Sequence, residues 1–161
     1  MMTSDFFSDL ASAKGAEQKV LEKLSSLTND YEFIDVSNEQ EYWHKGDILT
    51  INKATGARTF IEVKADSRIA ETHNILCEER IFFYESKKWV RGNFYSDYEI
   101  YAIYSASENK IYIFDFSILK KIYMRDGYFT KIQHKENLNE VILLPLDKAV
   151  AAGALIAELE V

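Results

Sequence analysis

Three residues of this 161-residue chain combine the side-chain types and the spacing that metal-assisted chemistry needs: Asp47, Glu62 and Lys64. They lie in segments 46–53 and 58–65, which have the composition of strands and are joined by a short turn. Because side chains alternate between the faces of a strand, a hairpin of these segments places all three on one face. Two carboxylates with Cβ atoms ~7–8 Å apart can share one divalent cation through oxygen–metal contacts of ~2.0–2.1 Å.

The turn between these segments sets the register of the hairpin. With the turn centred at Thr55 and Gly56, Asp47 is expected opposite Lys64. A four-residue loop would keep the polar side chains on one face, whereas a slip of one residue would separate them. The other face offers apolar side chains to the core: Ile48, Ile61 and Val63.

A fourth acid, Glu17, belongs to the segment 15–27, which has the pattern of an amphipathic helix. Glu17 is at the edge of its apolar stripe, which consists of Val20, Leu21, Leu24 and Leu27. An ionised carboxylate beside a core is costly unless a cation pairs with it. A metal ion or Lys64 is therefore expected near Glu17.

The remaining segments predict a mixed sheet with helices packed on it. Extra helical turns are expected within Ser4–Ala13, a loop at 66–72 and a basic, irregular segment at 87–96. The expected strands are 31–36, 74–85, 97–105, 110–116, 128–135 and 140–146. Further helices are expected at 117–125 and at 147–160, the second with Asp147 as its N-cap.

Composition limits the class of protein. The length favours one domain, 1–161, and 47% hydrophobic residues suffice for a buried core. A single cysteine, no signal-peptide pattern and no long apolar stretch favour a cytoplasmic protein with no membrane partner. The net charge of −7 argues against a general nucleic-acid coat protein, but it is compatible with metal-binding acids beside a local basic patch.

The order of a helix carrying Glu17, a strand, Gly46-Asp47-Ile48, a turn and Ile61-Glu62-Val63-Lys64 resembles the PD-(D/E)xK nuclease superfamily. This resemblance covers residues 15–66, with Gly in place of Pro before Asp47. A looser similarity to small phage-type and uncharacterised bacterial members involves Thr72 to Glu78, Trp89, and Ser96 to Tyr98. The resemblance implies an α/β (mixed α+β) fold with a restriction-endonuclease-like αβββαβ core, a central mixed sheet flanked by helices.

The resemblance also implies a role for each site residue. Asp47, Glu62 and the backbone carbonyl of Val63 would bind Mg²⁺, for which Mn²⁺ can substitute, and Glu17 would bind a second metal or a metal-bound water. Lys64 would orient or deprotonate the attacking water, or stabilise charge in the transition state. Phosphodiester hydrolysis needs a hydroxide at neutral pH and relief of negative charge at phosphorus, which a divalent metal and a positioned lysine supply.

The implied activity is hydrolysis of duplex or branched DNA, by an endonuclease rather than an exonuclease. A homodimer would suit cleavage of both strands of a duplex. The alternative is a non-catalytic nucleic-acid- or protein-binding module on the same fold, such as a subunit of a phage or defence system. The intact set of acids and lysine favours the nuclease, whereas the acidic net charge favours the module.

Three further features of the sequence allow more than one role. A basic and aromatic cluster could contact phosphates, with its tryptophan stacking on a base, or could be a solvated loop; it consists of Lys87, Lys88, Trp89, Arg91 and Asn93. Glu78 is expected to form a structural salt bridge, with a place in the active site as the alternative. His44, three residues before Asp47, is a possible additional site residue, and the other histidines are expected to serve packing or the surface.

Overall fold

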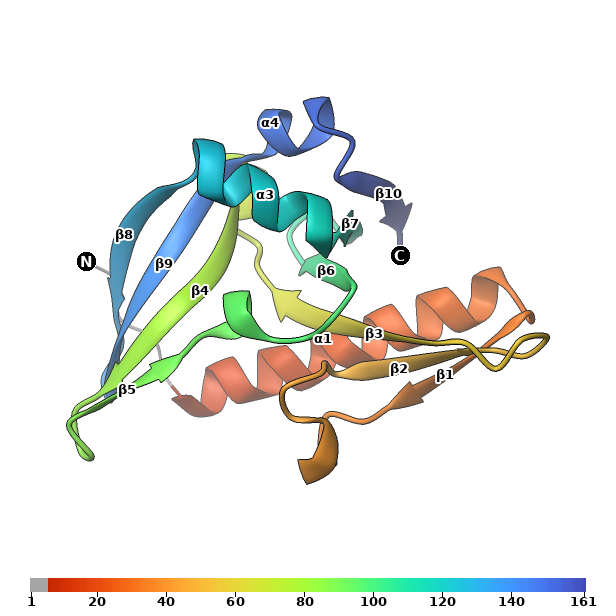
Figure 1. The fold of residues 1–161 in the computed structure, drawn as a ribbon, viewed down its shortest axis with the longest axis horizontal. Helices are drawn as coiled ribbons and strands as arrows, with labels where there is room; N and C mark the ends of the chain where they lie inside the picture. Colours follow the sequence, from red (N-terminus) through yellow and green to blue (C-terminus); the bar gives the residue numbers. More distant parts are fainter. Residues whose placement is uncertain (1–5) are drawn as a thin grey trace.

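The computed structural model describes residues 6–161 (Figure 1). Its helices are α1 (Phe6–Leu27), α2 (Ile69–Thr72), α3 (Phe116–Asp126) and α4 (Leu146–Ala151), with 3-10 turns η1 (Gln40–Tyr42) and η2 (Asn93–Tyr95). Its strands are β1 (Tyr31–Asp35), β2 (Ile48–Asn52), β3 (Arg58–Ala65), β4 (Asn74–Phe83), β5 (Lys88–Arg91), β6 (Ile100–Ser105), β7 (Lys110–Asp115), β8 (Tyr128–Gln133), β9 (Asn137–Pro145) and β10 (Leu155–Glu160). None of these helices has the length and apolar character needed to cross a bilayer.

The main sheet has six strands in the order β1-β2-β3-β6-β7-β10. Strands β3 and β6 are parallel and all other neighbours are antiparallel, so the sheet is mixed, as predicted. The predicted order of helix, three strands, helix and strand is present as α1, β1 to β3, α2 and β6, with β4 and β5 inserted before β6. The fold is therefore the expected mixed α+β class with a central mixed sheet flanked by helices.

Helix α1 covers one face of the main sheet and runs along β3 in Figure 1. Its buried residues Ala16 and Val20 belong to one apolar cluster with Ile48, Ile61 and Val63 of the hairpin. The predicted core face of the hairpin is therefore confirmed. The burial of this apolar face against α1 leaves the polar face of the hairpin turned away from the helix.

A second, antiparallel sheet has the order β5-β4-β9-β8 and faces the other side of the main sheet. Buried side chains of both sheets and of α3 form a second apolar cluster, and the hydroxyl of Tyr101 donates to the carbonyl of Leu76 at 2.7 Å between the sheets. Glu62 and Lys64 share register positions with Tyr101 and Ile103 of β6, whose side chains are buried in this cluster. The polar face of the hairpin therefore looks toward the second sheet.

The register of the β2–β3 hairpin differs by two residues from the predicted one. Ile48 pairs with Ile61, so Asp47, which directly precedes β2, is not opposite Lys64, and its N–H donates to the carbonyl of Ile61. The reason is the four-residue loop, in which the carbonyl of Asn52 accepts from the N–H of Gly56 at 2.7 Å. A shift of two residues preserves the alternation of side chains, so Asp47, Glu62 and Lys64 share one face as predicted.

Helix α1 is longer than predicted, and two segments predicted to be irregular contain short helices or a strand. The helix predicted at 15–27 begins at Phe6, so it includes most of Ser4–Ala13, of which Ser4 and Asp5 lie outside the described residues. The segment 66–72, predicted as a loop, contains the short helix α2, and 87–96, predicted as irregular, contains β5 and η2. The other predicted strands and the helix at 117–125 are present within a few residues of their predicted ends.

The closing helix predicted at 147–160 is wrong. Helix α4 ends at Ala151, and Asp147 is not its cap, since the N-cap position is Pro145. Gly153 follows with a φ of +76°, a left-handed conformation that stops a helix. The residues after it alternate between half-buried and exposed and form β10, which pairs with β7. The burial of side chains in this C-terminal segment therefore alternates every second residue, as in a strand, and not with the period of a helix.

Candidate active site

An open cleft of about 530 Å³ lies between the main sheet and the second sheet. Four of the predicted site residues line it from the side of α1 and the hairpin: Glu17, Asp47, Glu62 and Lys64. Glu78 of β4 lines it from the side of the second sheet. The structure thus brings together the acids and the lysine that the sequence singled out, and Glu78 both forms the salt bridge expected of it and lines the same cleft.

Asp47 is fixed by the backbone of β3. Its N–H donates to the carbonyl of Ile61 at 2.8 Å, and its Oδ2 accepts from the N–H of Val63 at 2.8 Å. The carboxylate therefore lies against β3, the strand that carries Glu62. Val63 itself lines the cleft, while its side chain packs in the core beneath α1.

Gly46 explains how Asp47 reaches this position. Its φ is +140°, a conformation that other residues rarely adopt, and a Cβ there would lie 2.9 Å from the carbonyl oxygen of Ile61. Proline cannot adopt this φ, because its ring holds φ near −65°. The glycine before Asp47 is therefore required by the close approach of the two strands.

The three acids on this side of the cleft are short of compensating positive charge. Burial, and then the charge of Asp47, raises the pKa of Glu62 to about 8. Burial also raises the pKa of Asp47, and burial together with the charge of Asp47 raises the pKa of Glu17. Oε2 of Glu17 is buried and accepts no hydrogen bond, although Lys14 Nζ lies 3.5 Å from it. A cation in the cleft would stabilise all three carboxylates.

Lys64 is held between two acids from different sheets. Its Nζ lies 2.8 Å from Oε1 of Glu78 and 3.9 Å from Oε1 of Glu62. Burial alone would lower the pKa of Lys64, but the charges of Glu78 and Glu62 outweigh it and raise this pKa above its usual range. In return, Lys64 lowers the pKa of Glu78. The pair is therefore an ammonium and a carboxylate at neutral pH.

The residues that could hold a metal ion are Asp47 and Glu62. Within the described part of the chain, no three side chains of His, Cys, Asp or Glu are arranged to hold a metal by themselves. Mg²⁺ is commonly bound through one or two carboxylates, with waters and substrate phosphate as its remaining ligands. Two carboxylates with raised pKa values, together with the Oε2 of Glu17, which accepts no hydrogen bond, fit such a cation.

The predicted basic and aromatic cluster lies apart from the acids. Trp89 pairs with Phe82 across β4 and β5, and their ring centroids are 5.2 Å apart. Ile81, the neighbour of Phe82, lines the cleft, so Phe82 and Trp89 lie on the opposite face of the second sheet. Arg91 shares that face with Trp89, whereas Lys87 and Lys88 lie exposed at the β4–β5 turn and at the start of β5.

Asn93 and His44 have surroundings that the sequence did not reveal. The Oδ1 of Asn93 accepts from the N–H of Glu78 at 2.8 Å, so this side chain supports the backbone of β4. Gly92 permits this contact, because a Cβ there would come within 2.2 Å of the carbonyl oxygen of Glu78. His44 is exposed, and it is not among the residues that line the cleft.

The cleft also has lining residues that the sequence did not reveal: His134, Asn137 and Asn139 from β9 and the turn before it, and Asp66 directly after β3. Of these, Asn139 touches the site most directly, since its Nδ2 donates to Oε2 of Glu78 at 3.0 Å. A signal was available, because Asn137 and Asn139 alternate at the start of a strand that is apolar from Val141 onward, and they must share one face. What the sequence could not supply was the sheet that this face would meet.

No protein-family profile matches the chain, and no curated protein matches it. Among solved structures, the chain is similar to a nuclease from a fusselovirus, with 11% identity over 94% of each chain and a TM-score of 0.40. At this level of likeness, nothing about fold or activity is carried over from that protein.

Proposed function

We propose that this chain is a Mg²⁺-dependent nuclease of the PD-(D/E)xK type that hydrolyses phosphodiester bonds in DNA, as an endonuclease. The observation that carries the proposal is that the β2–β3 hairpin brings Asp47, Glu62 and Lys64 to one cleft, which Glu17 of α1 also lines. The burial of three acids, Glu17, Asp47 and Glu62, is costly to folding, and a bound cation would offset that cost.

Asp47 and Glu62 would hold the metal ion, with the backbone carbonyl of Val63 as a further ligand. Bound there, a divalent metal supplies a hydroxide at neutral pH and relieves the negative charge of the phosphate. Glu17 is the remaining acceptor beside these two acids, and it would bind a second metal or orient a water. The hydrogen bond from the Val63 N–H keeps one oxygen of Asp47 fixed and leaves the other for a ligand.

Lys64 would act as a fixed positive charge rather than as a base. Its pKa lies above the usual range because Glu78 and Glu62 surround it, so it keeps its proton at neutral pH. An ammonium group stabilises the charge that develops on the phosphate oxygens during hydrolysis. Of the roles considered from the sequence, charge stabilisation and orientation of water are therefore favoured over proton abstraction.

The test is cleavage of supercoiled plasmid and of circular single-stranded DNA, with Mg²⁺, with Mn²⁺ and with a chelator. Wild type is compared with Lys64→Ala and with Lys53→Ala, a matched control in the exposed β2–β3 loop. The proposal expects metal-dependent cleavage that Lys64→Ala lowers by about 100-fold or more and Lys53→Ala leaves intact. Failure of wild type to cut either DNA with either metal would overturn the proposal and favour a binding module.

A further inference from the structure

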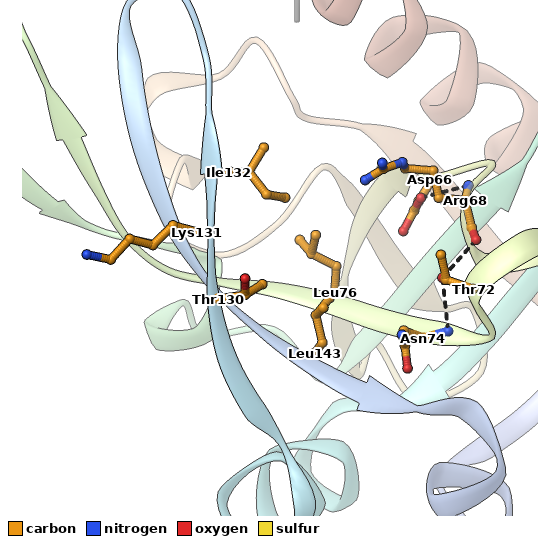
Figure 2. Close-up of a pocket in the computed structure, with 9 residues that line it drawn as sticks. All are labelled: Asp66, Arg68, Thr72, Asn74, Leu76, Thr130, Lys131, Ile132 and Leu143. Carbon is orange, nitrogen blue, oxygen red and sulfur yellow. Dashed lines mark hydrogen bonds between the residues drawn. The ribbon is translucent and has the colours of Figure 1, made fainter. Parts of the chain in front are cut away.

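A second hollow, of about 220 Å³, opens beside the cleft that holds the acids (Figure 2). We call it the side pocket. Leu76 of β4 and Leu143 of β9 lie at its floor, Thr130 and Ile132 of β8 form one wall, and the segment from Asp66 to Asn74 forms the other. The pocket thus has an apolar base between two walls that carry polar groups.

The side pocket is continuous with the acidic cleft. Asp66, Arg68, Leu76 and Ile132 line both spaces. Asp66 is two residues beyond Lys64 along the chain, directly after the end of β3. A strand of nucleic acid whose phosphate lies at Lys64 would therefore reach the side pocket with its neighbouring nucleotide.

The chemistry of the side pocket fits a nucleotide. The flat face of a base packs on apolar side chains, and its edge makes hydrogen bonds with hydroxyl and amide groups. Leu76 and Leu143 offer the apolar surface, and the polar side chains of Thr72, Asn74 and Thr130 also line the pocket, that of Asn74 donating to the hydroxyl of Tyr128. Figure 2 shows the guanidinium of Arg68 extending across the pocket toward β8, where a positive charge can contact a phosphate.

The acids of the main cleft are recessed, which disfavours a rigid duplex. The side chains of Glu17, Glu62 and Glu78 are only 9%, 16% and 17% exposed. An unpaired strand can bend into such a cleft, whereas a duplex holds its phosphates on a stiff outer surface. The net charge of −7 also disfavours the many phosphate contacts that binding to an intact duplex uses.

We propose that the side pocket binds one unpaired nucleotide next to the phosphate that is cut, so that the substrate is single-stranded DNA or an unpaired segment of branched DNA. This inference rests on the proposed function, since it takes the acidic cleft as the place where the phosphate binds. It names a binding subsite and a substrate class that the acids alone do not determine.

The experiment fills the pocket without touching the acids. Thr130 is exposed on β8 and faces the pocket, so Thr130→Trp fills it with a large ring. Phe129→Trp is the matched control, because Phe129 is the preceding residue on the same strand, is 66% exposed and points to the other face. Binding of a phosphorothioate oligothymidylate, which resists hydrolysis, and of its duplex with oligoadenylate is measured by fluorescence anisotropy with Mg²⁺ present.

The proposal expects wild type to bind the single strand at least about tenfold more tightly than the duplex. Thr130→Trp should lower the affinity for the single strand about tenfold. Phe129→Trp should bind like wild type. Equal affinity for the two oligonucleotides, no binding of either, or equal effects of the two variants would overturn it. Because binding is measured without cleavage, a chain that binds in this way but cuts nothing would retain the subsite while the proposed nuclease activity failed.

Discussion

The Nζ of Lys64 lies 2.8 Å from Oε1 of Glu78, and this ion pair joins β3 of the main sheet to β4 of the second sheet at the cleft. Asn139 of β9 donates to the other oxygen of Glu78 at 3.0 Å. The position of the lysine therefore depends on a sheet that contributes none of the other predicted catalytic residues.

Removing the Glu78 carboxylate should lower activity by releasing Lys64. Glu78→Gln keeps an oxygen that can accept from Lys64 and should lower kcat by about tenfold, whereas Glu78→Ala should lower it by about 100-fold. Glu79→Gln is the matched control, since Glu79 pairs with Tyr95 and does not line the cleft. The measurement is steady-state cleavage of a labelled oligonucleotide. Equal losses in Glu78→Gln and Glu79→Gln would count against a positioning role.

Stability without metal should fall as the pH rises, because of Glu62. The pKa of this carboxyl is about 8 in the folded chain against an ordinary value of 4.5, so the folded state holds a proton that the unfolded state has released. Where the unfolded state binds fewer protons, the free energy of unfolding decreases with rising pH. The decrease should begin near pH 4.5 and be complete above pH 8.

Thermal unfolding in a chelator, from pH 5 to pH 9, measures this effect. Glu62→Gln should flatten the fall in Tm, because its amide does not ionise. Glu71→Gln, an exposed acid on α2, should keep the slope of wild type. Parallel curves of Tm against pH for wild type and Glu62→Gln would show that the fall in Tm does not come from the burial of Glu62.

Asp47→Asn should raise the Tm of the metal-free chain. The amide oxygen of asparagine can still accept from the Val63 N–H, while the loss of charge relieves repulsion with Glu62 and Glu17. In wild type, saturating Mg²⁺ should raise the Tm by mass action, and Asp47→Asn should lose most of that rise. A lower Tm for Asp47→Asn in chelator would instead indicate that the Asp47 charge stabilises the fold.

Gly46→Ala should impair both folding and activity. The new Cβ would meet the Ile61 carbonyl at 2.9 Å, in a backbone conformation with φ of +140° that costs alanine about 1–3 kcal/mol. Because Asp47 follows directly, its carboxylate should move away from Val63. Gly15→Ala is the control, since a Cβ there meets nothing within 4 Å. Chemical denaturation and DNA cleavage are the two measurements, and unchanged values in both would contradict the reading of Gly46.

The part of the site that could be predicted is the part that local pattern determines. The alternation of Asp47, Glu62 and Lys64 holds in any register that differs by two residues, so an error in the turn did not separate them. Glu17 was found in the same way, as an acid out of place on an amphipathic helix. Both predictions needed only the periodicity of one element and one tight turn.

What could not be predicted is what depends on contacts between distant segments. Glu78 and Asn139 are 61 positions apart in the chain, and only the pairing of β4 with β9 brings them together. The face of β5 that carries Trp89 depends in the same way on its register with β4. The C-terminal segment 147–160 shows the same limit. Helix-forming residues in its first half concealed the alternation of its second half, which forms β10 and pairs with β7.

The most direct test of the central claim is a crystal of the protein soaked in Mn²⁺ and measured for anomalous scattering. The account predicts a peak between the carboxylates of Asp47 and Glu62, at oxygen–metal distances of about 2.0–2.3 Å, with Lys64 alongside. A peak only at another place on the molecule, or no peak between these two acids at saturating Mn²⁺, would contradict it.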